Sequence, residues 1–103
     1  MEAYTERHCR VVAEHRGGIL LKLSPFGVAG IPDRILLWPG GIVVFIEFKA
    51  QGKYLKPLQK FWRDRLCRLG FRVELFRSTA EFKSLLDSLP GPCQTSSVNQ
   101  SPE

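Results

Sequence analysis

An apolar segment near the middle of the chain carries two charges that a fully buried β-strand would exclude. Residues 42–49 read IVVFIEFK, so Glu47 follows five apolar residues and Lys49 comes two residues later. Strand side chains alternate between faces, and Glu47 and Lys49 therefore share a face with Val43 and Phe45. Buried charges are costly unless they are paired. The segment is therefore either an exposed strand or the wall of a functional site.

A β-hairpin determines whether these charges meet a second acid. Residues 34–38 (RILLW) form another apolar strand, and Pro39-Gly40-Gly41 between the two strands is a typical turn. With this three-residue connection Asp33 faces Glu47, and directly opposed residues have Cβ atoms about 5 Å apart on one face. A two-residue connection would turn Asp33 to the other face unless a bulge corrected the register.

Two carboxylates held that close repel each other, and the single Lys49 ammonium balances only one of them. A divalent cation removes the conflict, and a few oxygen ligands beside solvent are typical of Mg²⁺. His8 and His15 lie outside this stretch, which disfavours zinc. The predicted chemistry is phosphodiester hydrolysis, in which the metal polarises a phosphoryl oxygen and activates water. Lys49 would orient that water or offset charge in the transition state.

The same residues have simpler explanations. Asp33 can begin a strand as an ordinary turn residue. Glu47 and Lys49 can form a solvated stripe on an edge strand, where charges discourage aggregation. The convergence of all three residues under one hairpin register favours a functional site.

Composition narrows the class of partner. The 103 residues suffice for one domain, and 15 Lys and Arg against 10 Asp and Glu give a net charge of +5. This excess favours a polyanion such as nucleic acid, although many small domains are basic for solubility alone. Three scattered cysteines argue against a disulfide framework, and no apolar run approaches the roughly 18 residues of a membrane span. We therefore expect a cytoplasmic protein without a membrane segment.

Turn and capping residues divide the chain into seven elements. Gly17-Gly18 and Gly70 end helices, Pro57 suits a first helical residue, and Ser78 with Glu81 is a capping-box pattern. The predicted order is helix 3–16, strands 19–23, 34–38 and 42–49, helix 57–69, strand 71–76 and helix 78–89. The class is therefore α/β, with one domain over residues 1–89. Residues 90–103 have almost nothing to bury and are predicted to be a disordered tail.

Helical spacing also predicts which residues the three helices bury. The predicted apolar positions are Tyr4, Val11 and Val12 in the first helix, Leu58, Phe61, Trp62, Leu66 and Leu69 in the second, and Phe82, Leu85 and Leu86 in the third.

The hairpin motifs resemble a known nuclease family. IPD (31–33), followed after thirteen residues by EFK (47–49), is similar to the PD-(D/E)xK nuclease signature. More narrowly, GxPDR, PGG, EFKA, LxPLQ and LGFRV occur at spacings that resemble the virus-type replication-repair nuclease domain, VRR-NUC. The likeness runs from about residue 5 to residue 86. It implies a restriction-endonuclease-like core of order α-β-β-β-α-β-α, with a mixed sheet flanked by helices.

The resemblance also implies roles for particular residues. Asp33 and Glu47 would bind the metal, the backbone carbonyl of Phe48 would complete its shell, and Lys49 would be catalytic. Two further residues match family positions: Glu6, a metal ligand from the first helix, and Gln59, which would face the active site as a catalytic residue. Acidic residues near helix starts also occur for dipole reasons alone, and Gln59 can equally be a surface residue.

The family suggests a substrate and an assembly. Its stand-alone members resemble junction-resolving enzymes of DNA repair, tend to be homodimers and commonly come from phages or prophages. We therefore expect a Mg²⁺- or Mn²⁺-dependent DNA endonuclease acting as a homodimer on branched or structured DNA, such as a four-way (Holliday) junction. The alternative is a structured-DNA-binding module that does not cut, or a nuclease subunit that requires a partner.

Substrate contacts are the least family-like part of the chain. Residues 50–56 read AQGKYLK where APGGKLS is more usual, which adds Tyr54 and Lys56. Phosphate contacts are predicted for basic residues, although a solvated face would look the same. These residues are Lys22, Lys53, Lys56, Lys60 and Arg63.

Overall fold

The computed structural model describes residues 3–23 and 28–90, with side chains from residue 6 onward. Its elements are α1 (Ala3–His15), β1 (Ile19–Lys22), β2 (Arg34–Trp38), β3 (Ile42–Phe48), α2 (Pro57–Arg68), β4 (Arg72–Phe76) and α3 (Thr79–Ser88). The predicted α/β class and the order α-β-β-β-α-β-α are confirmed. The tail predicted for residues 90–103 lies outside the described residues, apart from Pro90.

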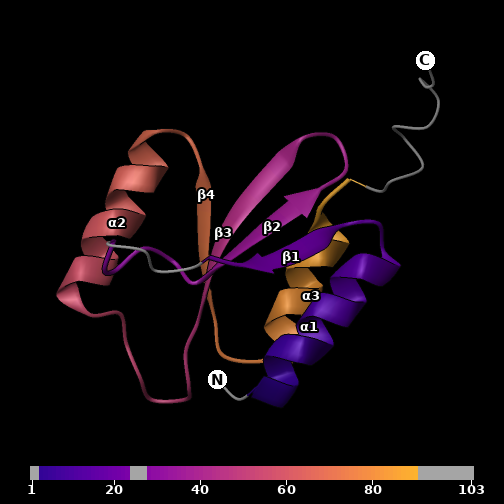
Figure 1. Ribbon diagram of the computed structural model, residues 1–103, viewed down its shortest axis with the longest axis horizontal. Coiled ribbons are helices and arrows are strands. Elements are labelled where there is room, and N and C mark those ends of the chain that lie inside the picture. The colour runs from indigo at the N-terminus through magenta and orange to yellow at the C-terminus, as the bar shows by residue number, and fades with distance from the viewer. Residues whose placement is uncertain (1–2, 24–27, 91–103) are drawn as a thin grey trace.

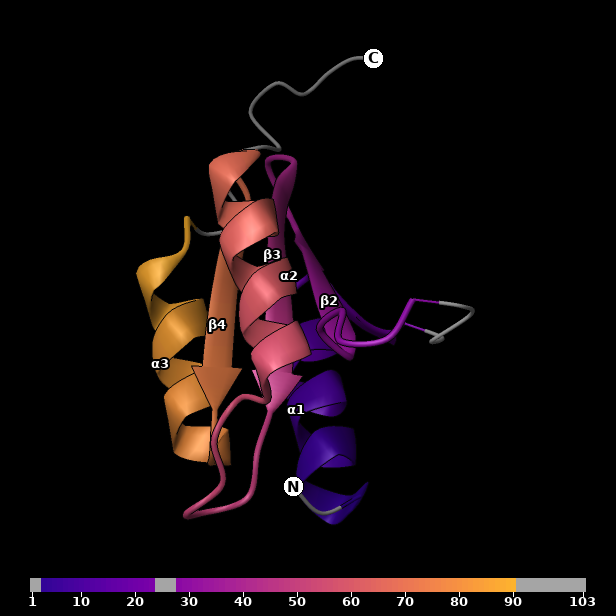
Figure 2. The same cartoon turned by 90° about the vertical axis from the view of Figure 1, so that its left-hand side faces the viewer.

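The four strands form one mixed sheet in the order β1-β2-β3-β4. β1 pairs antiparallel with β2 and β2 with β3, whereas β4 runs parallel to β3. Helices α1 and α3 lie side by side on one face of the sheet, and α2 lies on the other face against β4 (Figures 1 and 2). We call these the two-helix face and the α2 face.

The hairpin turn gives the predicted register. Ile35 pairs with Phe45 and Trp38 pairs with Ile42, so three residues connect the strands. Gly40 and Gly41 have φ of +91° and +77°, in the left-handed region that glycine tolerates best. Extending this register by one residue beyond β2 sets Asp33 opposite Glu47.

The core fills the space between the sheet and the two-helix face. Leu20, Leu36, Val44 and Ile46 point from the strands toward this face and are at most 1% exposed. The predicted inward side of α3 is confirmed, because Phe82, Leu85 and Leu86 are all buried. The Ser78 side chain accepts a hydrogen bond from the Glu81 backbone, as the capping-box pattern indicates.

Two helices bury different residues from those that helical spacing predicts. In α1 the core side is formed by Cys9 and Ala13, whereas Val11 is 43% exposed and Val12 is only partly buried. Cys9 and Ala13 are four residues apart and so lie on one face of the helix, and Val11 points between that face and solvent. Tyr4 falls outside the described side chains.

Helix α2 buries far less than its apolar pattern predicts. Leu66 is its only buried residue, and Leu58, Phe61 and Leu69 are 47%, 49% and 68% exposed. The helix packs mainly on β4 at one edge of the sheet, so within the described residues most of its side chains stay exposed or only partly buried. Within the described residues, none of the helices is both long and apolar enough to cross a membrane.

Candidate active site

Asp33 and Glu47 meet at the end of the hairpin opposite the turn. Asp33 immediately precedes β2 and Glu47 is the penultimate residue of β3. Glu47 is 8% exposed and is the sole buried charged residue in the described part of the chain. The buried Oδ1 of Asp33 has no hydrogen-bond partner there, and Arg34 Nη1 lies 3.6 Å from Oδ2. A buried carboxylate oxygen without a partner, beside the buried carboxyl of Glu47, is suited to binding a divalent cation.

Both carboxyls have raised pKa values. Burial raises the pKa of Asp33, and the charges of Arg34 and Lys49 and the backbone of Phe48 oppose this rise. Burial is the largest cause that raises the pKa of Glu47 to about 7, and the nearby Asp33 charge is the second. The charge of Lys49 opposes this rise. The charge of Asp33 thus opposes ionisation of Glu47, and the charge of Lys49 favours ionisation of both acids.

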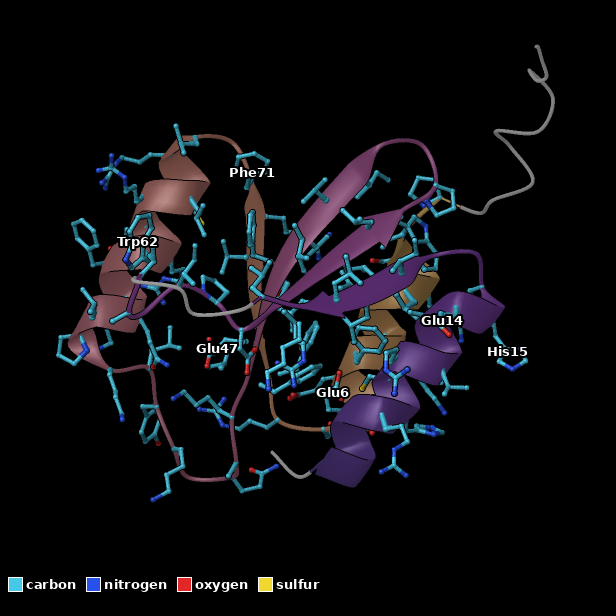
Figure 3. The ribbon with its side chains drawn as sticks, viewed as in Figure 1. Glu6, Glu14, His15, Glu47, Trp62 and Phe71 are labelled. Atoms are coloured by element: carbon cyan, nitrogen blue, oxygen red, sulfur yellow. The ribbon has the colours of Figure 1, made fainter. Side chains whose placement is uncertain are left out.

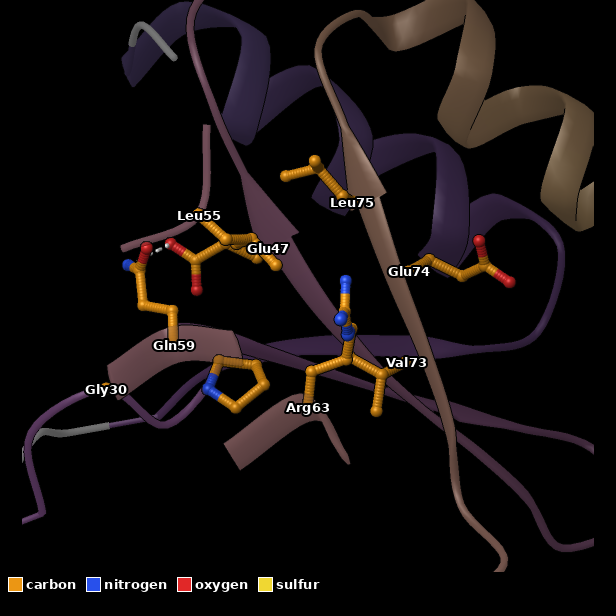
Figure 4. Close-up of a pocket in the computed structure, with 9 residues that line it drawn as sticks. Gly30, Glu47, Leu55, Gln59, Arg63, Val73, Glu74 and Leu75 are labelled. Carbon is orange, nitrogen blue, oxygen red and sulfur yellow. Dashed lines mark hydrogen bonds between the residues drawn. The ribbon is translucent and has the colours of Figure 1, made fainter. Parts of the chain in front are cut away.

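Gln59 joins Glu47 to the start of α2. Its Nε2 donates to Glu47 Oε2 at 3.3 Å, and its Oε1 accepts from the backbone N–H of Lys56 at 2.8 Å (Figure 4). One amide thus caps the helix and orients the acid. The expectation that Gln59 faces the site agrees with this contact, whereas a catalytic role for it stays a prediction.

A pocket of about 300 Å³ opens beside Glu47, between the α2 face of the sheet and α2 itself. Figure 4 shows the Arg63 guanidinium directed into this pocket and the Glu74 carboxylate pointing away from Glu47. The wall on the hairpin side is closed by Gly30, where an added Cβ would lie 2.7 Å from Leu58 Cγ. The full lining is Gly30, Pro32, Glu47, Leu55, Gln59, Arg63, Val73, Glu74 and Leu75.

Glu6 approaches the site from α1, at the same end of the sheet as Glu47 (Figure 3). Its Oε2 accepts from Arg34 Nε at 3.1 Å, and the Arg34 side chain is only 12% exposed. Arg34 also donates from Nη1 to the Asp33 carbonyl at 3.0 Å. Glu6 therefore contacts Asp33 through Arg34, and its role as a metal ligand stays a prediction.

Arg34 is a site residue that the sequence analysis did not single out. It lies in β2 and pairs with Ile46, which points to the two-helix face. Asp33 points to the other face, because neighbouring strand residues alternate. The signal available in the sequence was the arginine of GxPDR, a charged residue at the start of an apolar strand.

The predicted phosphate-contacting residues do not form one cluster. Lys22 ends the edge strand β1, Lys53 and Lys56 lie between β3 and α2, and Lys60 and Arg63 lie on α2. All four lysines are exposed and Arg63 is partly buried. Of these five residues only Arg63 lines the pocket, and Lys22 belongs to the opposite edge of the sheet.

The donor set fits a hard divalent cation held by few protein ligands. Among residues 3–23 and 28–90, no three His, Cys, Asp or Glu side chains are close enough together to hold a metal ion. Asp33 and Glu47 would therefore share the cation with backbone and water oxygens, as Mg²⁺ sites commonly do. A thiol site is disfavoured, since burial raises the pKa of Cys9 to about 11 and Cys67 lies on the exposed side of α2.

Fold and site together define a small α/β domain with an acidic pair and a lysine at the end of a β-hairpin. The VRR-NUC domain model matches residues 8–80, and the chain belongs to this family. A solved structure described as a VRR_NUC domain has a TM-score of 0.77 and 26% sequence identity, covering 86% of this chain and 97% of its own.

A curated relative comes from a virus. The protein named "Putative nuclease p44" of Acyrthosiphon pisum secondary endosymbiont phage 1 is 37% identical over 68 residues, which cover 66% of this chain and 73% of that protein.

Proposed function

We propose that this protein is a Mg²⁺- or Mn²⁺-dependent endonuclease that hydrolyses phosphodiester bonds of DNA, with branched or structured DNA such as a four-way junction as substrate. The observation that supports this most is the Asp33–Glu47 pair, whose Asp33 Oδ1 is buried without a partner in the described part of the chain. Membership of the VRR-NUC family and the nuclease name of the phage relative support the same chemistry.

Each residue of the site has a proposed task. A bound divalent metal would polarise a phosphoryl oxygen and lower the pKa of a bound water. Asp33 and Glu47 supply its carboxylate ligands, and Gln59 holds Glu47 in orientation from 3.3 Å. Lys49 follows the acids on the same strand face, where its ammonium orients the attacking water or offsets developing negative charge.

The Phe48 carbonyl is the proposed backbone ligand. The Lys49 N–H donates to the Phe76 carbonyl of β4 at 2.9 Å. The backbone of Phe48 forms a hydrogen bond with the Asp33 carboxyl. In an extended strand the N–H and C=O of one residue point to the same side. The Phe48 carbonyl is therefore directed to the side of Asp33, which favours it as a ligand.

Glu6 is the proposed additional ligand from α1, and two variants separate a ligand from a positioning residue. If Glu6 is a metal ligand, Glu6→Gln should weaken Mn²⁺ binding. Arg34→Ala, which releases Glu6 from its 3.1 Å ion pair, should then leave Mn²⁺ binding unchanged. Equal weakening by both variants, measured by calorimetry, would assign Glu6 to holding Arg34 against Asp33 instead.

A homodimer is proposed because a resolvase makes two symmetric cuts. The α2 face of the sheet offers a surface for it, since α2 lies over the β4 edge and not over β1 and β2 (Figures 1 and 2). Ile19, Leu21 and Leu37 are 47%, 46% and 36% exposed, and the register aligns them on that face. Apolar groups clustered on one face favour association.

The nuclease proposal is tested with the purified full chain, four-way junction DNA and linear duplex, in Mg²⁺, Mn²⁺ or EDTA. We expect junction cleavage that EDTA abolishes and that falls by at least about 100-fold in Asp33→Asn, whereas Asp64→Asn on the exposed side of α2 retains it. Cleavage that persists in EDTA or in Asp33→Asn would refute the metal mechanism. Junction binding by the wild type without cleavage would instead favour the binding-module alternative.

Lys49→Ala separates catalysis from binding. We expect cutting to collapse while junction affinity in EDTA changes little, because one ammonium contributes only a fraction of phosphate affinity. An equal loss of both would assign Lys49 to DNA binding.

A further inference from the structure

The segment between β3 and α2 carries an exposed aromatic residue beside the site. Tyr54 is 76% exposed, the highest value among the large apolar and aromatic side chains in the described part of the chain. A tyrosine left in water contributes little to the fold, because aromatic rings stabilise mainly through burial. In the views of Figures 1 and 2 this connector forms a loop beyond the end of β3.

Arg77 holds Tyr54 in place. The Arg77 guanidinium carbon lies 5.5 Å from the centroid of the Tyr54 ring, within the range of a cation–π contact. The same guanidinium donates from Nη2 to the Lys53 carbonyl at 2.6 Å, and the Arg77 backbone N–H donates to the Glu81 carboxylate on α3. Tyr54 is thus backed by the guanidinium of a residue whose backbone is bonded to α3.

The connector is further ordered by its own turn. The Lys53 N–H donates to the Ala50 carbonyl at 3.1 Å, and Gly52 within this turn has φ of +78°. A ring fixed in this way loses little conformational entropy when a flat ligand stacks on it.

Strand pairing brings this platform to the rim of the candidate active site. Glu47 pairs with Leu75 and Phe48 with Phe76 in the parallel β3–β4 ladder. Arg77 is the next residue, opposite Lys49, and alternation directs it toward the face that carries Glu47 and Leu75. Leu55, which follows Tyr54, lines the pocket together with Glu47.

We propose that Tyr54, backed by Arg77, is a stacking platform for an unpaired DNA base at the mouth of the site. The inference rests on the proposed nuclease function and adds the feature of the substrate that is recognised. A duplex conceals its base faces, whereas a branch point or single-stranded end offers them. Base stacking on an aromatic ring is tolerant of sequence, so the platform selects unpaired structure rather than a base. Exposed Lys53 and Lys56 flank Tyr54 and supply phosphate attraction that both kinds of DNA share.

The test measures binding in EDTA, with the full chain, a forked DNA carrying 2-aminopurine at its first unpaired position, and a duplex of the same sequence. We expect Tyr54→Ala to lower affinity for the fork by roughly 5- to 100-fold and to leave duplex affinity unchanged. Tyr54→Phe should keep the fork preference and the quenching of 2-aminopurine, because it retains the ring. Arg77→Gln should reduce both partially.

Lys53→Ala is the matched control from the same loop, and it should weaken fork and duplex equally because it removes only a phosphate attraction. An equal loss for both DNAs in Tyr54→Ala, or unchanged 2-aminopurine quenching, would overturn the platform. Mg²⁺-dependent cleavage by the wild type is scored separately on the same fork. Fork-selective binding without cleavage would refute the proposed nuclease activity and support the stacking platform. Cleavage without a preference for the fork would support the nuclease activity and refute the platform.

Discussion

Gln59 donates from Nε2 to Glu47 Oε2 at 3.3 Å while its Oε1 accepts from the backbone N–H of Lys56. A helix cap and an active-site contact therefore depend on a single side chain. Helix α2, which buries little of its own surface, is connected in this way to the acid that it must position.

The first prediction separates these two tasks of Gln59. Gln59→Ala removes both contacts, so we expect cleavage to fall about 10-fold or more and the free energy of unfolding to fall by about 1 kcal/mol. Gln59→Glu keeps an acceptor for the Lys56 N–H but replaces the donor to Glu47 with a like charge, so activity should fall and the loss of stability should be smaller at low pH, where one of the two acids is protonated. Urea unfolding and cleavage rates check this, with the exposed Gln51→Ala as control. Wild-type activity in both variants would contradict it.

The pKa of Glu47 predicts how stability changes with pH in the metal-free protein. Its pKa is raised from 4.5 when unfolded to about 7 when folded, so the folded state binds the proton more tightly. The contribution of Glu47 to stability should therefore be fully present below about pH 4.5 and be lost, by up to about 3 kcal/mol, as pH rises through 7. Glu47→Gln should remove this fall and leave the protein more stable than wild type at pH 8.

Urea unfolding in EDTA at pH 5 and pH 8 measures the effect of Glu47→Gln. Glu14→Gln, an exposed acid at the far end of α1, is the matched control and should follow the wild type. If the wild type and Glu47→Gln differ in stability by the same amount at both pH values, Glu47 is not the cause of the pH dependence.

Gly30 and Gly40 allow the cost of a close contact to be measured against a matched control. Both have φ of +91°, so an alanine at either position must adopt a left-handed backbone conformation. At Gly30 the added Cβ would also lie 2.8 Å from the Leu58 backbone oxygen, whereas nothing lies within 4 Å at Gly40. We expect Gly30→Ala to cost about 1–3 kcal/mol more than Gly40→Ala, as measured by urea unfolding. Equal costs would mean that the loop moves freely away from α2.

If the proposed dimer forms through the exposed apolar residues of β1 and β2 on the α2 face, a charged side chain introduced there should produce monomers. Leu21→Lys should shift the sedimentation coefficient to that of a monomer while changing folding stability by no more than about 0.5 kcal/mol, because Leu21 is 46% exposed. Leu69→Lys, at the end of α2 and 68% exposed, is the control and should remain a dimer. A wild-type protein that sediments as a monomer even with junction DNA would refute the dimer itself.

The hairpin could be predicted because its register depends on local chemistry. Pro39-Gly40-Gly41 allows a three-residue turn, and strand alternation then determines that Asp33 and Glu47 face each other. The site roles assigned to these residues stay predictions. What the sequence analysis did not predict depends on neighbours: Arg34 contacts Glu6 from a helix far away in the sequence.

Helix burial was predicted less well for the same reason. Helical spacing identifies which residues share a side, but it does not reveal whether another element covers that side. Phe61 therefore fits an apolar stripe and is still 49% exposed, because α2 lies at the sheet edge. In α3, which packs into the core, the same kind of pattern predicted burial correctly.

The hairpin turn lies five strand residues from the acidic pair, roughly 17 Å away. The turn contacts neither a metal nor DNA in the proposed mechanism. Its length nevertheless determines which face of the sheet each side chain of β2, and Asp33 before it, points to. Removing one residue there would turn the Arg34 side chain to the α2 face and set Asp33 opposite Ile46, on the two-helix face where Arg34 now contacts Glu6. If the proposed nuclease activity is correct, selection for it therefore also acts on the length of a distant loop.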